Sequence, residues 1–348
     1  MMTNTNLFLD IHVIQAVPPA NINRDDTGSP KTAQYGGVTR ARVSSQSWKK
    51  AMRDYFNANG TDSNVGIRSL EIVKYLADKI QEKDNTINDD DALKVANDTL
   101  NNAKISTKDN RLKALFFLGS AQVEKLAQAA IDGVKDKKAL QEILVDNPAV
   151  DIALFGRMVA DDPSLNEDAS AQVAHAISTH AVQTEFDFFT ATDDLAAEDN
   201  AGAGMLGTIE YNASTLYRYA NVAAHELLKQ LDDKTATINA LKLFVDAFVK
   251  SMPTGKINTF ANQTLPSAVV VVLRSDRPVN IVNTFENPIK ANGGYVDKSI
   301  QQLEKGLQDA DCFVAKPLSM LTIGLKDNNQ LNFDTLLAQL DSDLTDNL

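Results

Sequence analysis

Hydrophobic and polar positions alternate at the start of the chain. Between Leu7 and Val13 every second residue is apolar, which is the period of a strand with one buried face. Residues 18–37 are rich in Pro, Asn, Asp and Gly and predict a loop. The stretch "VTRARVSS" then predicts a short strand that runs into a helix, with Ser44 or Ser45 as the N-cap.

The helix that follows has two distinct sides. At about 100° per residue its apolar side chains share one sector, and they are Trp48, Ala51, Met52 and Tyr55. The opposite side carries Lys49, Lys50 and Arg53. The pattern predicts a core-packed face and an outward row of cations, and it favours a core position for the tryptophan over stacking on a base.

The middle of the chain is charged and mostly helical in period, from about Asn57 to Asp168. Four stretches predict helices, at 69–81, 91–103, 121–133 and 137–146, with a short strand at 114–119. Two strand-like stretches follow, at 184–195 and 205–214, joined by "AAEDNAGAG". Together they predict a long β-hairpin with a mobile tip.

The C-terminal third predicts a mixture of helices and strands. We expect a helix at Leu241–Ser251, strands at 267–274 and 279–285, a helix at Ser299–Gln308 and an acidic, solvated tail from Asp327.

Basic residues gather near the N-terminus of a chain whose net charge is −12. Residues 23–53 hold seven basic side chains against two acidic ones, a local charge of +5, so the other residues together carry −17. Arg40 and Arg42 are two apart on the predicted strand and so share a side. Hydroxyl, amide and helix N-terminal N–H groups follow at 44–46. The segment therefore predicts a polyanion-binding surface.

Composition limits the class of protein. A chain of 348 residues with 43% hydrophobic residues is typical of a globular protein. The single cysteine, Cys312, excludes an intramolecular disulfide and is typical of a reducing compartment. The N-terminus does not resemble a secretion signal, and the longest apolar run, 268–273, is too short to span a bilayer. We expect a soluble, cytoplasmic protein without a membrane partner.

Two sets of residues suggest metal chemistry. The adjacent carboxylates of Asp25 and Asp26 could hold Mg²⁺ for phosphodiester cleavage, but Asp25 suits a turn-forming loop residue equally well. His175 and His180 are five residues apart, so neither a helix nor a strand directs both at one metal. We expect structural histidines, no metal site and no cofactor.

Six stretches, in order, resemble the CasC family, the backbone subunits of the type I-E CRISPR surveillance complex Cascade. They are "NRDD", "YGGVTRARVSSQSWKKAMR", "ALFGRMVADDP", "AHAISTHAVQTEFDFFTATDDL", "GTIEYNASTLYRYANV" and "PTGKINTFANQTLPSAVVVVLR". The resemblance implies an α+β fold with a ferredoxin-like (RRM-type) palm, a helical fingers domain and a β-hairpin thumb. On this chain the palm would comprise 1–58, 171–188 and 212–348, the fingers 59–170 and the thumb 189–211.

The resemblance also implies a non-enzymatic function. Copies of such a subunit stack as a helical filament along one CRISPR RNA, beside other Cascade subunits, and each thumb reaches over RNA held by its neighbour. The displacement of one guide base at regular intervals leaves the intervening bases free to pair with target DNA.

The resemblance places guide-backbone contacts at Arg24, Lys31, Ser44, Gln46, Lys49 and Arg53. Charge and geometry add Arg40, Arg42 and Lys50. Met158, in "LFGRM", resembles the apolar side chain placed beside the displaced base.

Two other hypotheses remain open on the sequence. Related backbone subunits of type III complexes cut RNA with an aspartate on the loop after the first strand, so Asp25 or Asp26 could serve a metal-dependent ribonuclease. A metabolic enzyme could instead bind a small phosphorylated substrate at the basic segment.

Overall fold

The computed structural model describes residues 6–60, 65–191, 205–325 and 332–348. The chain forms two compact units. Unit 1 comprises Met1–Met52, Val173–Asn221 and Val245–Asp346, and unit 2 comprises Arg53–Gln172, Val222–Phe244 and Asn347–Leu348.

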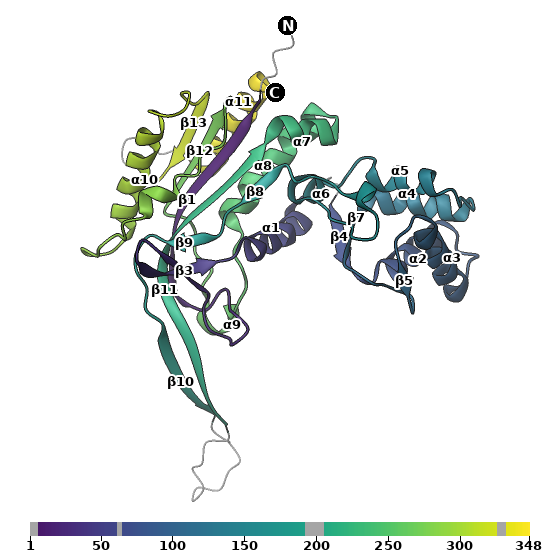
Figure 1. Cartoon of the computed structure of the whole chain (residues 1–348), viewed down its shortest axis with the longest axis horizontal. Helices are drawn as coiled ribbons and strands as arrows, with labels where there is room; N and C mark the ends of the chain where they lie inside the picture. Colours follow the sequence, from purple (N-terminus) through teal and green to yellow (C-terminus); the bar gives the residue numbers. More distant parts are fainter. Residues whose placement is uncertain (1–5, 61–64, 192–204, 326–331) are drawn as a thin grey trace, which may run out of the picture. The chain divides into compact units, whose positions relative to one another are not determined.

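A nine-stranded sheet lies mostly in unit 1 (Figure 1). Its order is β13 (Ser319–Ile323), β12 (Ala268–Arg274), β1 (Phe8–Ala20), β11 (Met205–Ala223), β9 (Ala176–Ser178), β3 (Val38–Val43) and β2 (Thr32–Tyr35). Two further strands, β8 (Ala171–Val173) and β10 (Glu185–Ala191), pair with β11. β12 is antiparallel to both of its neighbours. The fold is α+β, as the sequence predicted.

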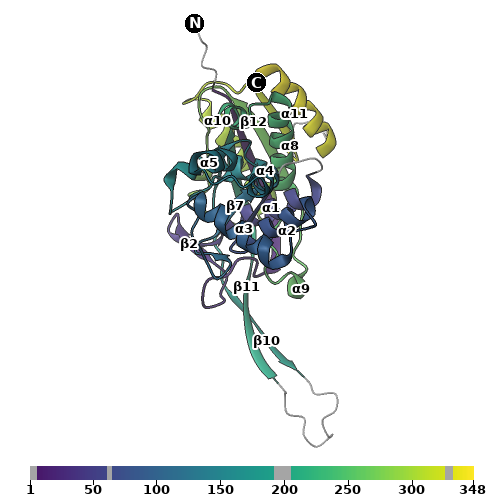
Figure 2. The same cartoon turned by 90° about the vertical axis from the view of Figure 1, so that its right-hand side faces the viewer.

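Helices cover both faces of this sheet. All seven residues of β12 are buried, including those that meet Ile300, Leu303 and Leu307 of α10 (Val296–Ala310). Figure 2 shows α10 on one side of β12 and α11 (Phe333–Asn347) on the other. The prediction of a solvated acidic tail is wrong, because the leucines of α11 recur at every fourth residue and are fully buried: Leu336, Leu340 and Leu344.

Unit 2 is mainly helical. Four helices share one hydrophobic core, and they are α2 (Ile72–Lys83), α3 (Asp89–Asn102), α4 (Ser120–Ile131) and α5 (Lys137–Val145). β4 (Gly66–Ser69) pairs with β7 (Phe116–Gly119), and β5 (Thr107–Lys108) pairs with β6 (Arg111–Leu112). The four predicted helices and the strand at 114–119 are confirmed. The short α6 (Val150–Phe155) and η1 (Pro163–Leu165) follow them, and α7 (Ala224–Leu231), not predicted, also belongs to this unit.

Sequence reasoning misplaced two elements of the C-terminal third. Helix α8 (Lys234–Lys250) begins seven residues before its predicted start. The predicted strand at 279–285 is instead a short 3₁₀ helix, η2 (Val282–Phe285). The Asn280 side chain accepts a hydrogen bond from the Val282 N–H at 3.0 Å, which turns the backbone where a strand would have continued.

The predicted hairpin is confirmed as β10 and β11. They pair antiparallel from Glu185↔Tyr211 to Ala191↔Met205 and extend away from the rest of the sheet (Figures 1 and 2). The Phe189 ring lies over Gly207, where an added Cβ would be 2.3 Å from it. The tip "AAEDNAGAG" lies outside the described residues.

Candidate nucleic-acid interface

Helix α1 (Ser45–Asn59) carries most of the predicted contacts and begins at the predicted cap. The N–H of Ser47 donates to Ser44 Oγ at 3.4 Å. The backbone N–H of Ser44 itself donates to Asn23 Oδ1 at 2.8 Å, which ties the helix start to the first loop. Ser44 is thus buried and occupied by capping, while Gln46 and Lys50 are exposed.

The apolar side of α1 is anchored by Trp48, which is 1% exposed. Its ring is 3.7 Å from the guanidinium carbon of Arg218, which also faces the Phe248 ring at 4.5 Å. Burial lowers the pKa of Arg218 to about 9, so it stays charged at neutral pH. The predicted core position of the tryptophan is confirmed, and it orients the opposite, cationic side of the helix.

Lys49 and Arg53 lie one helical turn apart and are half-buried. Burial lowers the pKa of both groups. Within unit 2 the Arg53 guanidinium lies 5.4 Å from the centroid of the Phe117 ring. That ring fixes the direction of the cation, and Arg68 stands opposite Phe117 in the β4–β7 register.

The first loop is organised by Asp25. Its Oδ1 accepts hydrogen bonds from the Thr27 hydroxyl at 2.7 Å and from the N–H groups of Thr27 and Ser29, each at 3.0 Å. The hydroxyl of Thr27, before the other donors, holds the pKa of Asp25 below its ordinary value. This is a turn-forming role. Arg24 is exposed at one end of the loop and Lys31 half-buried at the other.

The loop after α8 packs against the first loop and against the base of the hairpin. Gly255, in "PTGK", lies so close to the first loop that an added Cβ would be 2.3 Å from the Ile22 carbonyl oxygen. The next turn is α9 (Ile257–Phe260), and the Phe260 ring contacts Tyr211 of β11 at 5.8 Å. Asn21 Nδ2 adds a bond to the hairpin at the Glu210 carbonyl, 2.8 Å away.

Arg40 is a correction to the predicted contacts. Its side chain is 0% exposed and donates to the carbonyl oxygens of Tyr35, Ser178, Phe285 and Glu286 at 2.9–3.1 Å. A guanidinium with its donors committed inside the protein is not available to phosphate. Arg40 joins segments of unit 1, and we remove it from the interface.

Arg42 is half-buried, so the two strand arginines have different environments. Its Nε donates to the Thr32 carbonyl at 3.0 Å, and its Nη1 is 3.2 Å from His175 Nδ1. The expectation of a structural role fits His180, which is buried, accepts the Thr215 N–H at 3.0 Å and stacks on Tyr295. His175 is exposed and contacts Arg42, so for this residue the structural role stays a prediction. Sequence alone held no signal for this, because the neighbours of His175 come from distant segments.

Met158 lies in unit 2 and is 83% exposed. The preceding Arg157 is buried and donates to the carbonyls of Leu165 at 2.9 Å and Leu144 at 2.7 Å. Gly156 has φ +78°, and a Cβ there would be 3.0 Å from the Glu167 carbonyl oxygen. These contacts fix the backbone on both sides of Met158 and leave its side chain in solvent, so its place beside a displaced base stays a prediction.

The hairpin also exposes apolar side chains. Phe186 and Phe188 point to one face of β10 and are 66% and 65% exposed. Leu206, 61% exposed, stands opposite Thr190 on that same face.

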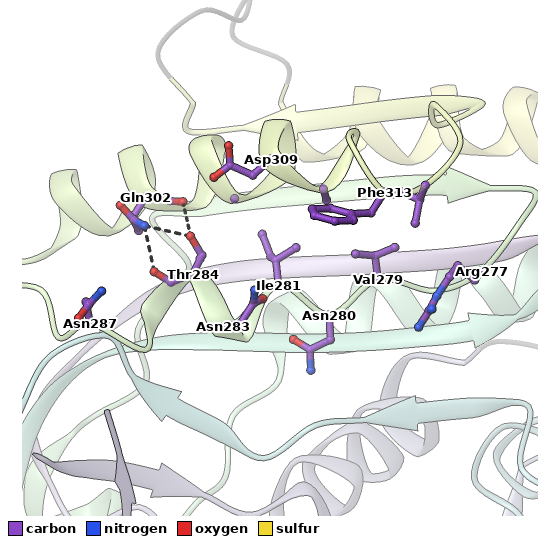
Figure 3. Close-up of a pocket in the computed structure, with 13 residues that line it drawn as sticks. Arg277, Val279, Asn280, Ile281, Asn283, Thr284, Asn287, Gln302, Asp309 and Phe313 are labelled. Atoms are coloured by element: carbon purple, nitrogen blue, oxygen red, sulfur yellow. Dashed lines mark hydrogen bonds between the residues drawn. The ribbon is translucent and has the colours of Figure 1, made fainter. Parts of the chain in front are cut away.

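Asp25 and Asp26 belong to no cluster of metal-ligating side chains in the part of the chain that the structure describes. Among the described residues no group of three or more His, Cys, Asp or Glu could hold a metal ion. A surface pocket of about 500 Å³ lies instead between η2 and α10 (Figure 3). Its charged lining residues are one cation, Arg277, and one acid, Asp309. No described helix is long and apolar enough to cross a membrane.

An antiparallel sheet covered by helices, a helical unit and a projecting hairpin define an α+β protein of the RAMP-like kind. The family model of the CT1975-like proteins matches residues 9–346. The chain belongs to the CT1975-like protein family.

Solved structures agree with this assignment. One similar chain is from a "CRISPR RNA-guided surveillance complex, pre-nicking"; it is 30% identical with a TM-score of 0.83, and the match covers 98% of this chain and all of that one. Another, from a "CRISPR RNA-guided surveillance complex", is 27% identical with a TM-score of 0.65 and the same coverage. No curated protein sequence matches the chain.

Proposed function

We propose that this protein is a non-catalytic, cytoplasmic CRISPR RNA-binding backbone subunit of a type I-E Cascade complex. One observation in unit 1 carries the proposal. The Asn23–Ser44 hydrogen bond brings the loop that holds Arg24 and Lys31 to the start of α1, the helix that carries Gln46, Lys49 and Lys50. Basic side chains and exposed amide groups that converge from a loop and a helix suit a sugar-phosphate backbone and carry no base specificity.

The assembly follows from the family resemblance. Further copies of the chain would stack as a helical filament, each hairpin acting on RNA held by the neighbouring copy, together with other Cascade subunits. Met158 would lie beside a displaced guide base, and the intervening bases would pair with target DNA. The palm, fingers and thumb are proposed at the boundaries predicted from the sequence, except for Val222–Phe244, which the sequence assigned to the palm and which belongs to the compact unit that holds the helices.

The test is to express the chain alone and identify what co-purifies. RNA in a size-heterogeneous assembly supports the proposal, whereas a monomer that binds no CRISPR RNA overturns it. Incubating the complex with labelled CRISPR RNA and Mg²⁺ then tests the absence of catalysis. We expect intact RNA, because the Asp25 carboxylate is engaged by three donors of its own loop. Cleavage that Asp25→Asn with Asp26→Asn abolishes would establish the ribonuclease hypothesis instead.

A further inference from the structure

Three residues with nitrogen-bearing side chains, from separate segments of unit 1, are held near one another beside β3. Lys31 ends the first loop, Arg42 lies on β3, and His175 lies between β8 and β9. The backbone N–H of Arg42 donates to the backbone carbonyl of Lys31 at 2.9 Å, and the guanidinium Nη1 of Arg42 lies 3.2 Å from His175 Nδ1. Sheet pairing holds these segments together, because Arg42 is opposite Ile177 of β9.

The protonation state of His175 follows from this contact. A guanidinium can only donate, so Nδ1 accepts and the imidazole is neutral with its proton on Nε2. Partial desolvation of the imidazole, and then the charges of Arg42 and Lys31, lower the pKa of His175. These two cations are the charged groups that act on the imidazole from the neighbouring segments. An anion bound between Lys31, Arg42 and His175 would instead favour the protonated imidazole and raise the pKa of His175.

A small cavity adjoins the same two cations. It has a volume of about 20 Å³, and its lining includes Lys31, Arg42, Asn212 and Ser214. That volume admits about one water molecule or hydroxyl group. Asn212 is 7% exposed, and its Nδ2 is buried without a hydrogen-bond partner. Because an unpaired buried donor is costly, this amide is available to donate to an oxygen atom that enters the cavity.

We propose that Lys31, Arg42 and His175 form one phosphate subsite for the RNA backbone, and that His175 takes up a proton from solvent when the phosphate binds. The inference rests on the proposed function and deepens it. The incoming proton adds to Nδ1, which ceases to accept from Arg42. The Nδ1–H and the released Arg42 N–H both then donate to phosphate oxygens, and the Asn212 amide donates to an adjoining oxygen of the same nucleotide.

Proton uptake makes RNA affinity depend on pH. Binding strengthens as pH falls wherever the bound complex holds more protons than the free protein. We expect the affinity of the wild type to rise about threefold to tenfold between pH 8 and pH 6, the range in which histidine charges.

The test measures binding of labelled CRISPR RNA to the full chain at pH 6, 7 and 8 and constant ionic strength. The variants are His175→Gln and, as a matched control in unit 2, His225→Gln. His175→Gln should bind about threefold or more weakly at pH 6, lose the pH dependence and leave the pH 8 affinity within about twofold. His225→Gln should behave as the wild type. Calorimetry in two buffers of different ionisation enthalpy should show proton uptake by the wild type that His175→Gln lacks.

An unchanged pH dependence in His175→Gln, or no proton uptake by the wild type, would overturn the subsite while leaving RNA binding in place. Absence of RNA binding at all three pH values would overturn the proposed function and this subsite with it. Asn212→Ala supplies an independent measurement. It should weaken RNA binding at pH 6 and pH 8 by the same factor, and an unchanged affinity would remove the amide from the subsite.

Discussion

Two arginines on one strand show how single residues divide between structure and recognition. Arg40 and Arg42 are two positions apart on β3, yet Arg40 is fully buried against four backbone carbonyls and Arg42 is half-buried beside His175. A period of two specifies which face of a strand a side chain leaves from, but it does not specify what covers that face. The segment that covers Arg40 includes Phe285, far away in the sequence.

The two arginines should therefore respond differently to the same substitution. Arg40→Met leaves buried carbonyl groups without donors, so we expect the free energy of unfolding of unit 1 to fall by about 2–5 kcal/mol. Arg42→Met should change stability by less than about 1 kcal/mol but weaken RNA binding. Urea unfolding and RNA binding, measured on both variants, check this. Equal losses of stability would show that Arg42 is as structural as Arg40.

Periodicity predicted elements well where one face of an element packs on a core. The four helices of unit 2 and the β12 strand follow from their spacing and apolar content, because the same spacing buries them. It failed where a side chain redirected the backbone, as Asn280 does before η2. The candidate site was also predictable only in part. The cap at Ser44 and the core position of Trp48 were predictable from local sequence, whereas the meeting of His175 with Arg42 depends on the pairing of β3 with β9.

The β10–β11 hairpin exposes apolar side chains on one face, among them Phe186, Phe188 and Leu206. We propose that Phe186 and Phe188 contact a neighbouring copy. Phe186→Ser with Phe188→Ser should leave the free energy of unfolding nearly unchanged, since both rings are about two-thirds exposed. It should weaken each copy-to-copy contact about a hundredfold or more, at roughly 1.5 kcal/mol or more for each of the two rings. The readout is the dependence of binding on RNA length.

Asp187→Asn on the opposite face of the strand is the matched control, and it should keep the wild-type length dependence. A double-serine variant that still assembles on long RNA as cooperatively as the wild type would show that this hairpin face contacts no neighbour.

Each unit of the molecule contains a buried carboxyl group whose charged form is disfavoured. Burial raises the pKa of Asp10 in unit 1 and of Asp151 in unit 2 to about 6. Hydrogen bonds and nearby cations offset only part of the cost of burying the carboxylate charge. The Asp10 carboxylate accepts a hydrogen bond from the Tyr219 hydroxyl at 2.8 Å, and it lies 3.2 Å from Arg274 Nε. When the pKa of a carboxyl group is higher in the folded than in the unfolded chain, the group contributes to the free energy of unfolding at low pH. That contribution is complete below the unfolded-state pKa of about 3.9 and is lost as pH rises through the folded-state pKa of about 6.

We therefore expect the protein to become less stable from pH 5.5 to pH 7.5, by about 1 kcal/mol for each of the two groups. Urea unfolding across this range checks the sign. Asp151→Asn should remove the contribution of unit 2, so the difference between wild type and variant should itself change with pH. A constant difference would show that Asp151 titrates alike in the folded and unfolded chains.

The charge of the molecule is unevenly divided between one basic segment and the other residues. The basic segment carries +5 while the other residues carry −17, so a polyanion is attracted locally and repelled elsewhere. For single strands, log K falls with log salt at a slope of about −0.7 per phosphate neutralised. Lys49→Ala with Arg53→Ala should make this slope shallower by about 1.4 and weaken binding to all RNA sequences alike.

Lys94→Ala with Lys305→Ala is the control, because it changes the net charge equally at exposed positions outside the basic segment. If net charge alone drove binding, the two double variants would lose affinity equally and share one salt slope. If the α1 cations contact phosphate directly, only the first variant changes the slope. A loss confined to particular RNA sequences would place Lys49 and Arg53 against bases instead of the backbone.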